Sequence, residues 1–300
     1  MHYTPSTTHQ TLSVVLATLN EEQNIGSCLE SIKTIADEII IVDESSTDKT
    51  REIAEKYGAK VIKVKHKENF HINKQKAIET ATGDWILQLD ADERVSPELA
   101  KEIVEVVNSP NDELLKRVLD SPSTKNLKLF SRHQRLIEQR EGRLGIHNGQ
   151  IVAFFIPRRN FFLGKPLIHA GVYPDGVIRL IKRGKARLPG KSVHEVMEVD
   201  GEVGWLFNDL EHHDSPTLQR YLERMNRYTD LQAEELRRNE VPVNAFYMLL
   251  YTCYRPAITF LKLYIRHRGY LDGMRGFIWS FFSSLHYPLS YFKYWQAQKS

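Results

Sequence analysis

Short apolar runs alternate with helical patterns along the first part of the chain. Residues 12–19 (LSVVLATL) form an apolar, β-branched run that predicts a strand, and a helical pattern follows it as far as Ile32. The same order recurs at once, with a strand predicted over residues 38–42 (EIIIV) and a helix over 49–57 that ends before Gly58. Two strand–helix units in tandem predict a parallel sheet.

The alternation continues to a strand that ends in acidic residues. Residues 60–64 (KVIKV) predict a third strand, residues 72–81 a helix and residues 84–89 (DWILQL) a fourth strand. The acidic run 90–93 (DADE) follows directly. Because open α/β sheets bind their ligands at the carboxyl ends of strands, this run marks the expected site.

Further elements are predicted beyond this point. A helix is expected from Pro97 to about Val107, and the polar residues 109–150 predict an inserted helical excursion. Residues 151–182 contain runs typical of strands, and residues 218–238 have clear helical spacing. These patterns predict an α/β fold with a mostly parallel central sheet.

The last part of the chain has a different composition. Sixteen of the 60 residues from Val241 onward are Phe, Tyr or Trp. Two apolar stretches, 243–265 and 276–292, are interrupted by basic residues or by Pro288, so neither is predicted to span a membrane. Basic residues are interspersed with the aromatic ones: Arg255, Lys262, Arg266, Arg268, Arg275, Lys293 and Lys299.

This mixture is typical of an amphipathic helical anchor that lies in the plane of an anionic membrane surface. We therefore expect a main domain over residues 1–240 and a membrane-associating helical tail over residues 241–300. The protein would then be peripheral, on the cytoplasmic face of the inner or plasma membrane. The alternative is a helical appendage packed on the main domain or in a dimer.

Composition and charge exclude several classes. The 41 basic and 38 acidic side chains leave a formal charge of +3, too balanced to indicate a nucleic-acid partner. Cys28 and Cys253 are the only cysteines, so a disulfide framework or a cysteine-based zinc site is not expected. The polar first residues do not resemble a secretory signal.

Asp90 and Asp92 are the strongest candidates for chemistry. They form a DXD motif around Ala91 at a strand end, so both carboxylates can project on the same side. A hard cation held by carboxylates, Mg²⁺ or Mn²⁺, neutralises charge that grows on phosphate oxygens when a nucleoside diphosphate leaves. The alternative is a solvated turn or a cap for the helix at Ser96.

The loops after the first two strands add further candidates. Asp43 ends the second strand, where a carboxylate can accept hydrogen bonds from a base or a ribose. Three residues of the first strand and its loop can reach the nucleotide to which that base and ribose would belong: Ala17, Leu19 and Glu21. Helix capping is the alternative for these acidic loops, and Asp48 fits it best.

Three blocks carry a family resemblance. SVVLATLNEEQNI, EIIIVDESSTDKT and GDWILQLDADE, in this order and spacing, resemble the signature blocks of glycosyltransferase family 2, whose members are inverting enzymes of the GT-A fold. Ala17 departs from the pattern, where many members have Pro, and so does Glu44-Ser45, where many have Asp-Gly. Neither departure removes a charged group. The resemblance implies a nucleotide-diphospho-sugar donor.

Four later blocks, GVYPDGVIRLIKR, SVHEVMEVDGEVGWL, LEHHDSPTLQRYLERMNRYT and GYLDGMRGF, resemble the bacterial lipopolysaccharide-core β-glucosyltransferases and their relatives. With them the resemblance covers nearly the whole chain except residues 109–150. It implies a glycan or lipid-linked acceptor of the cell envelope.

An inverting transfer needs one general base for the acceptor hydroxyl, and the resemblance places it at Glu195. His194 is a secondary candidate, and His212 matches the position of a late metal ligand, although His213 beside it leaves the choice open. Arg179 interrupts an apolar run and is preferred to Lys76 as a cation for the diphosphate. The expected donor-binding residues are Ala17, Leu19, Glu21, Asp43, Asp90, Ala91 and Arg179, and the expected metal ligands are Asp90 and Asp92, with His194 and His212 as weaker candidates.

Other functions fit the sequence less well. A nucleotidyltransferase or a Rossmann dehydrogenase would need a glycine-rich loop after the first strand, and NEEQNIG lacks it. Two alternatives keep the same fold: a transferase that acts on a polyprenyl phosphate, and an inactive membrane-bound scaffold. Loss of catalysis should first erode Asp43, Asp92 and the base, and all are present, which favours an active enzyme.

Overall fold

The computed structural model describes residues 9–67, 69–119, 124–142, 144–190 and 196–298. The chain forms two compact units, each built from two segments: Met1–Arg158 with Pro174–His212, and Arg159–Tyr173 with His213–Ser300.

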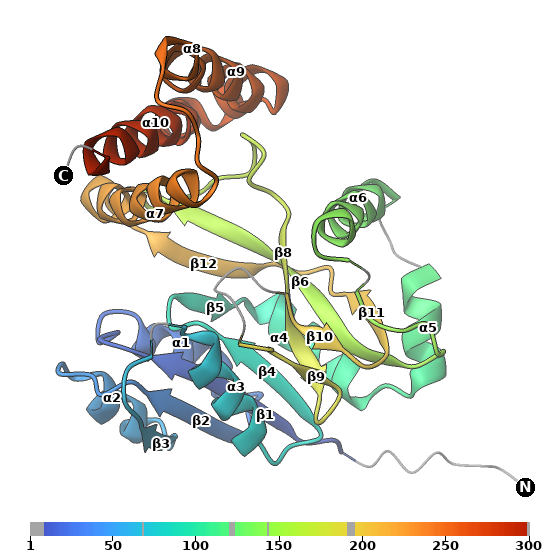
Figure 1. Ribbon diagram of the computed structural model, residues 1–300. Coiled ribbons are helices and arrows are strands. Elements are labelled where there is room, and N and C mark those ends of the chain that lie inside the picture. Colours follow the sequence, from blue (N-terminus) through green and yellow to red (C-terminus); the bar gives the residue numbers. More distant parts are fainter. Residues whose placement is uncertain (1–8, 68, 120–123, 143, 191–195, 299–300) are drawn as a thin grey trace, which may run out of the picture. The chain divides into compact units, whose positions relative to one another are not determined.

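The first unit contains most of one large sheet (Figure 1). Its strands are β1 (Leu12–Thr18), β2 (Glu38–Asp43), β3 (Lys60–Lys63), β4 (Trp85–Leu89), β5 (Glu93–Val95), β8 (Asp175–Lys182) and β11 (Glu202–Trp205), with β6 (Ile151–Phe162) and β12 (Leu210–Ser215), which run on into the second unit. A separate pair consists of β9 (Ala186–Arg187) and β10 (Glu198–Val199). The helices of the first unit are α1 (Ile25–Ile32), α2 (Thr50–Lys56), α3 (His71–Thr80), α4 (Pro97–Asn108), α5 (Asn111–Leu119) and α6 (Thr124–Glu141).

The strand order is β3-β2-β1-β4-β8-β6-β12-β5. The pairs β2–β3, β1–β2 and β1–β4 are parallel, which confirms the predicted α/β fold and its parallel sheet for the first four strands. The pairs β4–β8, β6–β8 and β5–β12 are antiparallel. Parallel neighbours need a crossover connection, and α1, α2 and α3 supply one after each of the first three strands. Beyond β4, β11 pairs in parallel with β6.

β1 lies in the middle of the parallel part and is covered on both faces. Val14, Val15 and Leu16 have no exposed surface. Val14 and Leu16 belong to the core cluster that includes residues of α1 and α4, while α3 packs against β1 and β2. With β2 and β4 on either side of β1, the loops that follow these three strands meet at one edge of the sheet.

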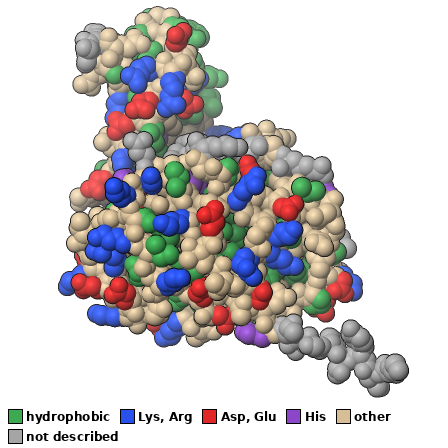
Figure 2. Space-filling view, turned by 60° about the horizontal axis from the view of Figure 1, so that its bottom comes forward, with side chains coloured by type: hydrophobic (Ala, Val, Ile, Leu, Met, Phe, Trp, Pro, Cys, Tyr) green, Lys and Arg blue, Asp and Glu red, His purple; other side chains and the backbone are tan. Residues whose placement is uncertain are grey.

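The surface carries both signs of charge. In Figure 2, Lys and Arg side chains lie beside Asp and Glu side chains over the face shown, with hydrophobic side chains between them. Neither sign gathers into a single patch among the coloured side chains of this face. This face therefore offers no concentrated field of one sign.

The second unit is mainly helical. It contains the short strand β7 (Lys165–Pro166), α7 (Leu218–Arg238), a continuous helical segment made of α8 (Ala245–Leu249), η1 (Leu250–Tyr254), α9 (Arg255–Leu261) and η2 (Lys262–Arg266), the turn η3 (Gly269–Asp272) and α10 (Gly273–Ala297). The helix predicted over residues 218–238 is confirmed as α7. Among the described residues, no helix combines the length and apolar character that crossing a bilayer requires.

The division of the chain differs from the predicted boundary between residues 240 and 241, because α7 groups with the C-terminal helices. The ring of Tyr221 lies 5.6 Å from that of Trp279, and the Lys293 Nζ atom lies 2.7 Å from Asp230 Oδ1. These contacts join α7 to α10 along most of its length. The helical pattern predicted α7 itself, but it carried no information about which neighbour α7 contacts.

The aromatic residues of the tail divide into two groups. Tyr251, Tyr291 and Tyr294 are buried and form a small core with residues of α7. Others are exposed, including Phe246 at 69% and Tyr254 at 62%. Part of the aromatic composition therefore serves packing within this unit, and part remains at its surface.

Candidate active site

The loops after β1 and β2 are joined to each other. Asn20 and Ser45 have positive φ angles of 55° and 64°, an uncommon conformation for residues other than glycine. The Asn20 side chain accepts a hydrogen bond from Thr47 N at 2.8 Å, and Asn20 N donates to Ser46 Oγ at 2.9 Å. Strained backbone held in place by cross-links of this kind is typical of binding loops.

Asp43, at the end of β2, is fully buried. Its carboxylate accepts hydrogen bonds from Ser46 N at 2.9 Å and from Thr18 Oγ1 at 3.2 Å, and it lies 3.5 Å from Arg51 Nε. Asp43 thus holds the second loop in shape. The direct nucleotide contact predicted for it remains a prediction.

The other predicted donor residues of the first loop lie nearer the surface. Leu19 is 39% exposed, and Ala17 is partly buried in β1. Glu21 accepts a hydrogen bond from Asn24 at 2.7 Å, and its charge acts on Asp92. The fold therefore brings Glu21 to the acidic end of β4, as the order of the loops predicted.

Asp90 directly follows β4 and lies in a network of charged groups. Its carboxylate pairs with the Lys74 ammonium and lies 2.6 Å from Arg179 Nη2. Burial acts in the opposite direction, but the charges of Arg179 and Lys74 hold the pKa of Asp90 well below its ordinary value. Asp90 is therefore a compensated anion, and a metal is not needed to balance its charge.

Arg179 serves the same network. Its guanidinium lies 2.7 Å from the fully buried Glu93 carboxylate and also donates to Gln88 Oε1. Only 6% of Arg179 is exposed. The structure thus places Arg179 as the counter-charge of Asp90 and Glu93, and the contact with a donor diphosphate predicted for it remains a prediction.

Several members of the network were not predicted. Lys74 and Arg158 were missed, and Glu93 was placed in the acidic run at the site but given no role. Arg158 pairs with Asp175 at 2.6 Å and with Glu93 at 3.4 Å. Lys76, considered instead of Lys74, is exposed on α3. A signal for Lys74 was present, because it lies three and four residues before the buried Ala77 and Ile78 and so on the same face of the helix.

Asp92 is the carboxylate that this network does not neutralise. Burial first, and then the charges of Asp90, Glu93 and Glu21, raise the pKa of Asp92 to about 7. Its Oδ2 atom lies 3.6 Å from Nε2 of His212, and His212 is placed there because β12 pairs with β5. Of the residues predicted as metal ligands, Asp92 and His212 are brought together.

These two side chains fit a divalent cation. Within the described part of the chain, no group of three or more His, Cys, Asp or Glu residues is arranged to hold a metal ion. Mg²⁺ is commonly bound through only one or two carboxylates, with substrate phosphates completing its coordination. The Asp92 carboxylate and the imidazole beside it supply donor atoms for such a site. A bound cation would also balance the negative charge that the neighbouring carboxylates concentrate around Asp92.

The predicted base lies elsewhere. Glu195 and His194 fall outside the described residues, so nothing is concluded about their positions. Their roles as general base and secondary metal ligand remain predictions.

Comparison with known proteins identifies the family. The family model for glycosyl transferase family 2 matches residues 13–169, just over half of the chain. The chain belongs to glycosyltransferase family 2. The resemblance read from the signature blocks is confirmed, and the α/β architecture is that of the GT-A fold of this family.

Relatives of this family 2 glycosyltransferase include the lipopolysaccharide core biosynthesis glycosyltransferase LpsC of Rhizobium meliloti, which is 28% identical over 89% of this chain and 85% of its own length. An uncharacterized glycosyltransferase of Rickettsia bellii is 44% identical, but the match covers about a third of each protein. Among solved structures, glucosyl-3-phosphoglycerate synthase of Mycobacterium tuberculosis is 17% identical, with a TM-score of 0.41 over 78% of this chain and 82% of that chain.

Proposed function

We propose that the enzyme transfers a sugar, with inversion, from a nucleoside-diphosphate donor to a hydroxyl of a cell-envelope glycan, and that Asp92 and His212 hold Mg²⁺ or Mn²⁺ at the donor. The uncompensated Asp92 carboxylate beside His212, at the strand edge where the three loops meet, carries this proposal. A metal ion bound there would offset the negative charge of the departing diphosphate.

The surrounding residues have separable roles in this proposal. Lys74 and Arg179 keep Asp90 ionised and fixed at the end of β4, where its backbone positions Asp92. Asp43 and Asn20 hold the loops after β2 and β1 in the strained shape that faces the nucleotide. Such rigid support matters because catalysis by positioning depends on side chains that do not need to reorganise.

Binding of the donor tests the proposal directly. Purified full-length protein would be titrated with UDP-, GDP- and dTDP-sugars, with Mn²⁺ and again with a chelator, by calorimetry and by hydrolysis of the donor. Saturable binding of one donor that requires the metal would support the proposal. A folded protein that binds no donor under any condition would instead favour an inactive scaffold.

The proposed class of acceptor is based on LpsC, the relative whose similarity extends along most of this chain. LpsC is named for lipopolysaccharide core biosynthesis, and the similarity covers 89% of this chain. We propose an acceptor of the same class, an envelope glycan. Transfer to a polyprenyl phosphate, in an assay that offers both acceptors, would contradict the proposed acceptor class. It would not affect the proposal for the donor and its metal.

Glu195 remains our candidate for the general base. Glu195→Gln should lower kcat for transfer by about 10²- to 10⁴-fold, because an amide cannot take the acceptor's proton, while the affinity for the donor stays within about twofold. Single-turnover transfer and donor calorimetry measure the two effects separately. Transfer at the wild-type rate would show that another group is the base.

We also propose that the second unit binds the cytoplasmic leaflet of the inner membrane. Exposed apolar side chains, between 48% and 69% exposed, recur along the helical segment 245–266: Phe246, Leu249, Ile258, Leu261 and Ile265. From residue 241 to the end the sequence has seven Lys or Arg and a single acidic residue, Asp272. An apolar stripe with excess positive charge suits an anionic lipid surface.

Vesicle binding tests this surface without truncating the chain. Ile258→Ser with Leu261→Ser should weaken binding to phosphatidylglycerol-containing vesicles by at least about tenfold, because less apolar surface enters the lipid. Leu136→Ser with Ile146→Ser is the matched control, since these residues are similarly exposed in the first unit. Equal flotation of both double variants would contradict the proposal.

A further inference from the structure

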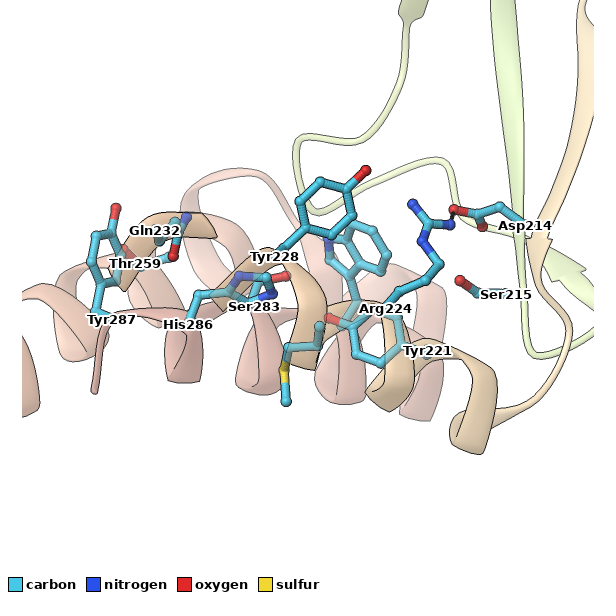
Figure 3. Close-up of a pocket in the computed structure, with 12 residues that line it drawn as sticks. Asp214, Ser215, Tyr221, Arg224, Tyr228, Gln232, Thr259, Ser283, His286 and Tyr287 are labelled. Carbon is cyan, nitrogen blue, oxygen red and sulfur yellow. Dashed lines mark ion pairs between the residues drawn. The ribbon is translucent and has the colours of Figure 1, made fainter. Parts of the chain in front are cut away.

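A cavity of about 340 Å³ lies within the second unit (Figure 3). Its lining comes from α7, α9 and α10 and from the end of β12, all of which belong to this unit. Residues 221, 225, 228 and 232 of α7 line it from one face of that helix, and residues 279, 283, 286 and 287 of α10 line it from the other side. Its size lies at the lower end of the range for small-molecule sites.

Aromatic rings form firmly held walls of this cavity. Tyr221 and Trp279 are 5.6 Å apart with planes inclined by 46°, and the buried Phe162 contacts both rings edge-on at 5.1 and 5.5 Å. Tyr228, in contrast, is 43% exposed and lies toward solvent. The walls are thus fixed by packing before any ligand arrives, and one aromatic ring remains accessible.

The charges around the cavity cancel. Arg224 forms an ion pair with Asp214, which Figure 3 shows at one end of the lining. Burial lowers the pKa of His286, so its imidazole is neutral at pH 7. The cavity therefore holds no net charge that would attract a phosphate or a nucleotide.

Uncharged hydrogen-bonding groups also line the cavity. Ser215 is 1% exposed, its hydroxyl makes no hydrogen bond to the described residues, and Figure 3 shows it directed toward the Arg224 side chain. Gln232 and Thr259 also contribute to the lining. An acyl chain in this cavity would leave such groups without partners, at a cost in free energy, whereas a ligand with several hydroxyls would satisfy them.

We propose that this cavity binds one sugar residue of an uncharged glycan, with the accessible ring of Tyr228 against the C–H face of the sugar and the polar groups bonded to its hydroxyls. The ligand is then a part of the acceptor glycan, so the inference rests on the proposed function. The cavity lies within the second unit, whereas Asp92 belongs to the first. In this proposal the sugar it holds is a recognition element of the acceptor.

Saturation-transfer NMR with the full-length protein tests the site. The probes are the methyl glycosides of glucose, galactose and mannose, with inorganic phosphate and a short-chain lipid as competitors. At least one glycoside should bind saturably, and Tyr228→Ala should weaken its binding by about tenfold or more. Tyr270→Ala, a similarly exposed tyrosine of the same unit that does not line the cavity, should leave the binding unchanged. Gln232→Ala provides a second variant at an exposed position of the lining.

Three results would overturn the inference: no glycoside bound by the folded wild type, binding that both Tyr228→Ala and Gln232→Ala leave intact, or displacement by phosphate or the lipid. Metal-dependent donor binding by the same wild-type sample is measured in parallel. If the donor binds and the glycosides do not, the cavity proposal fails alone. If the donor does not bind, the proposed function itself fails.

Discussion

Asp92→Asn should lower kcat/KM for sugar transfer by about 10³-fold, because a metal site that stabilises the departing diphosphate contributes several kcal/mol, at 1.36 kcal/mol for each factor of ten. The asparagine keeps the size of the side chain but removes the charge beside His212. Metal-dependent donor binding should be lost with it. Calorimetry with Mn²⁺ and initial-rate assays of transfer measure both effects.

The same substitution should not destabilise the metal-free protein. Asp92 is buried beside Asp90, Glu93 and Glu21, and its charge is opposed by both its burial and theirs. Asp92→Asn should therefore leave the free energy of unfolding unchanged or raise it, whereas Asp112→Asn, at an exposed position of α5, should alter neither activity nor stability. An Asp92→Asn protein that unfolds more readily and still binds metal and donor would contradict the metal assignment.

The parallel half of the fold was predictable because its signals are local. The strands β1, β2 and β4 lie within a residue or two of the predicted runs, since each is an apolar run closed by polar loop residues. Ligand residues could be located for the same reason. Asp43 and Asp90 end or follow their strands in sequence, so their meeting at one edge follows from the parallel order alone.

The ion pairs of the site were not predictable in this way, because they depend on register. β4 and β8 are antiparallel with Leu87 opposite Leu180, which sets Gln88 across from Arg179. The apolar pattern of β8 predicts a strand but does not say which residue of β4 faces Arg179. For that reason Arg179 was expected at the donor, and its place between Asp90 and Glu93 appears only in the folded chain.

Arg179→Met should lower the free energy of unfolding by about 3–5 kcal/mol, the range expected when one partner of a buried ion pair is removed. Methionine fills much of the same space, so the loss comes mainly from the charges left behind. Among the described residues, Glu93, which has no exposed surface, would keep one cation, Arg158 at 3.4 Å, and the hydrogen bond from Asp90 N. Asp90 would keep its ion pair with Lys74. Urea unfolding followed by circular dichroism measures the change.

Arg187→Met is the matched control, because Arg187 pairs with Glu198 at 2.6 Å while its side chain is 70% exposed, and surface pairs of this kind contribute less than about 1 kcal/mol. If uncompensated charge causes the loss, adding Glu93→Gln to Arg179→Met should restore part of the stability, although each substitution alone is destabilising. If the loss in free energy of unfolding of the double variant equals the sum of the losses of the two single variants, Arg179 acts through packing and hydrogen bonds. An Arg179→Met protein as stable as the control would show that the carboxylates at the end of β4 do not need their counter-charge.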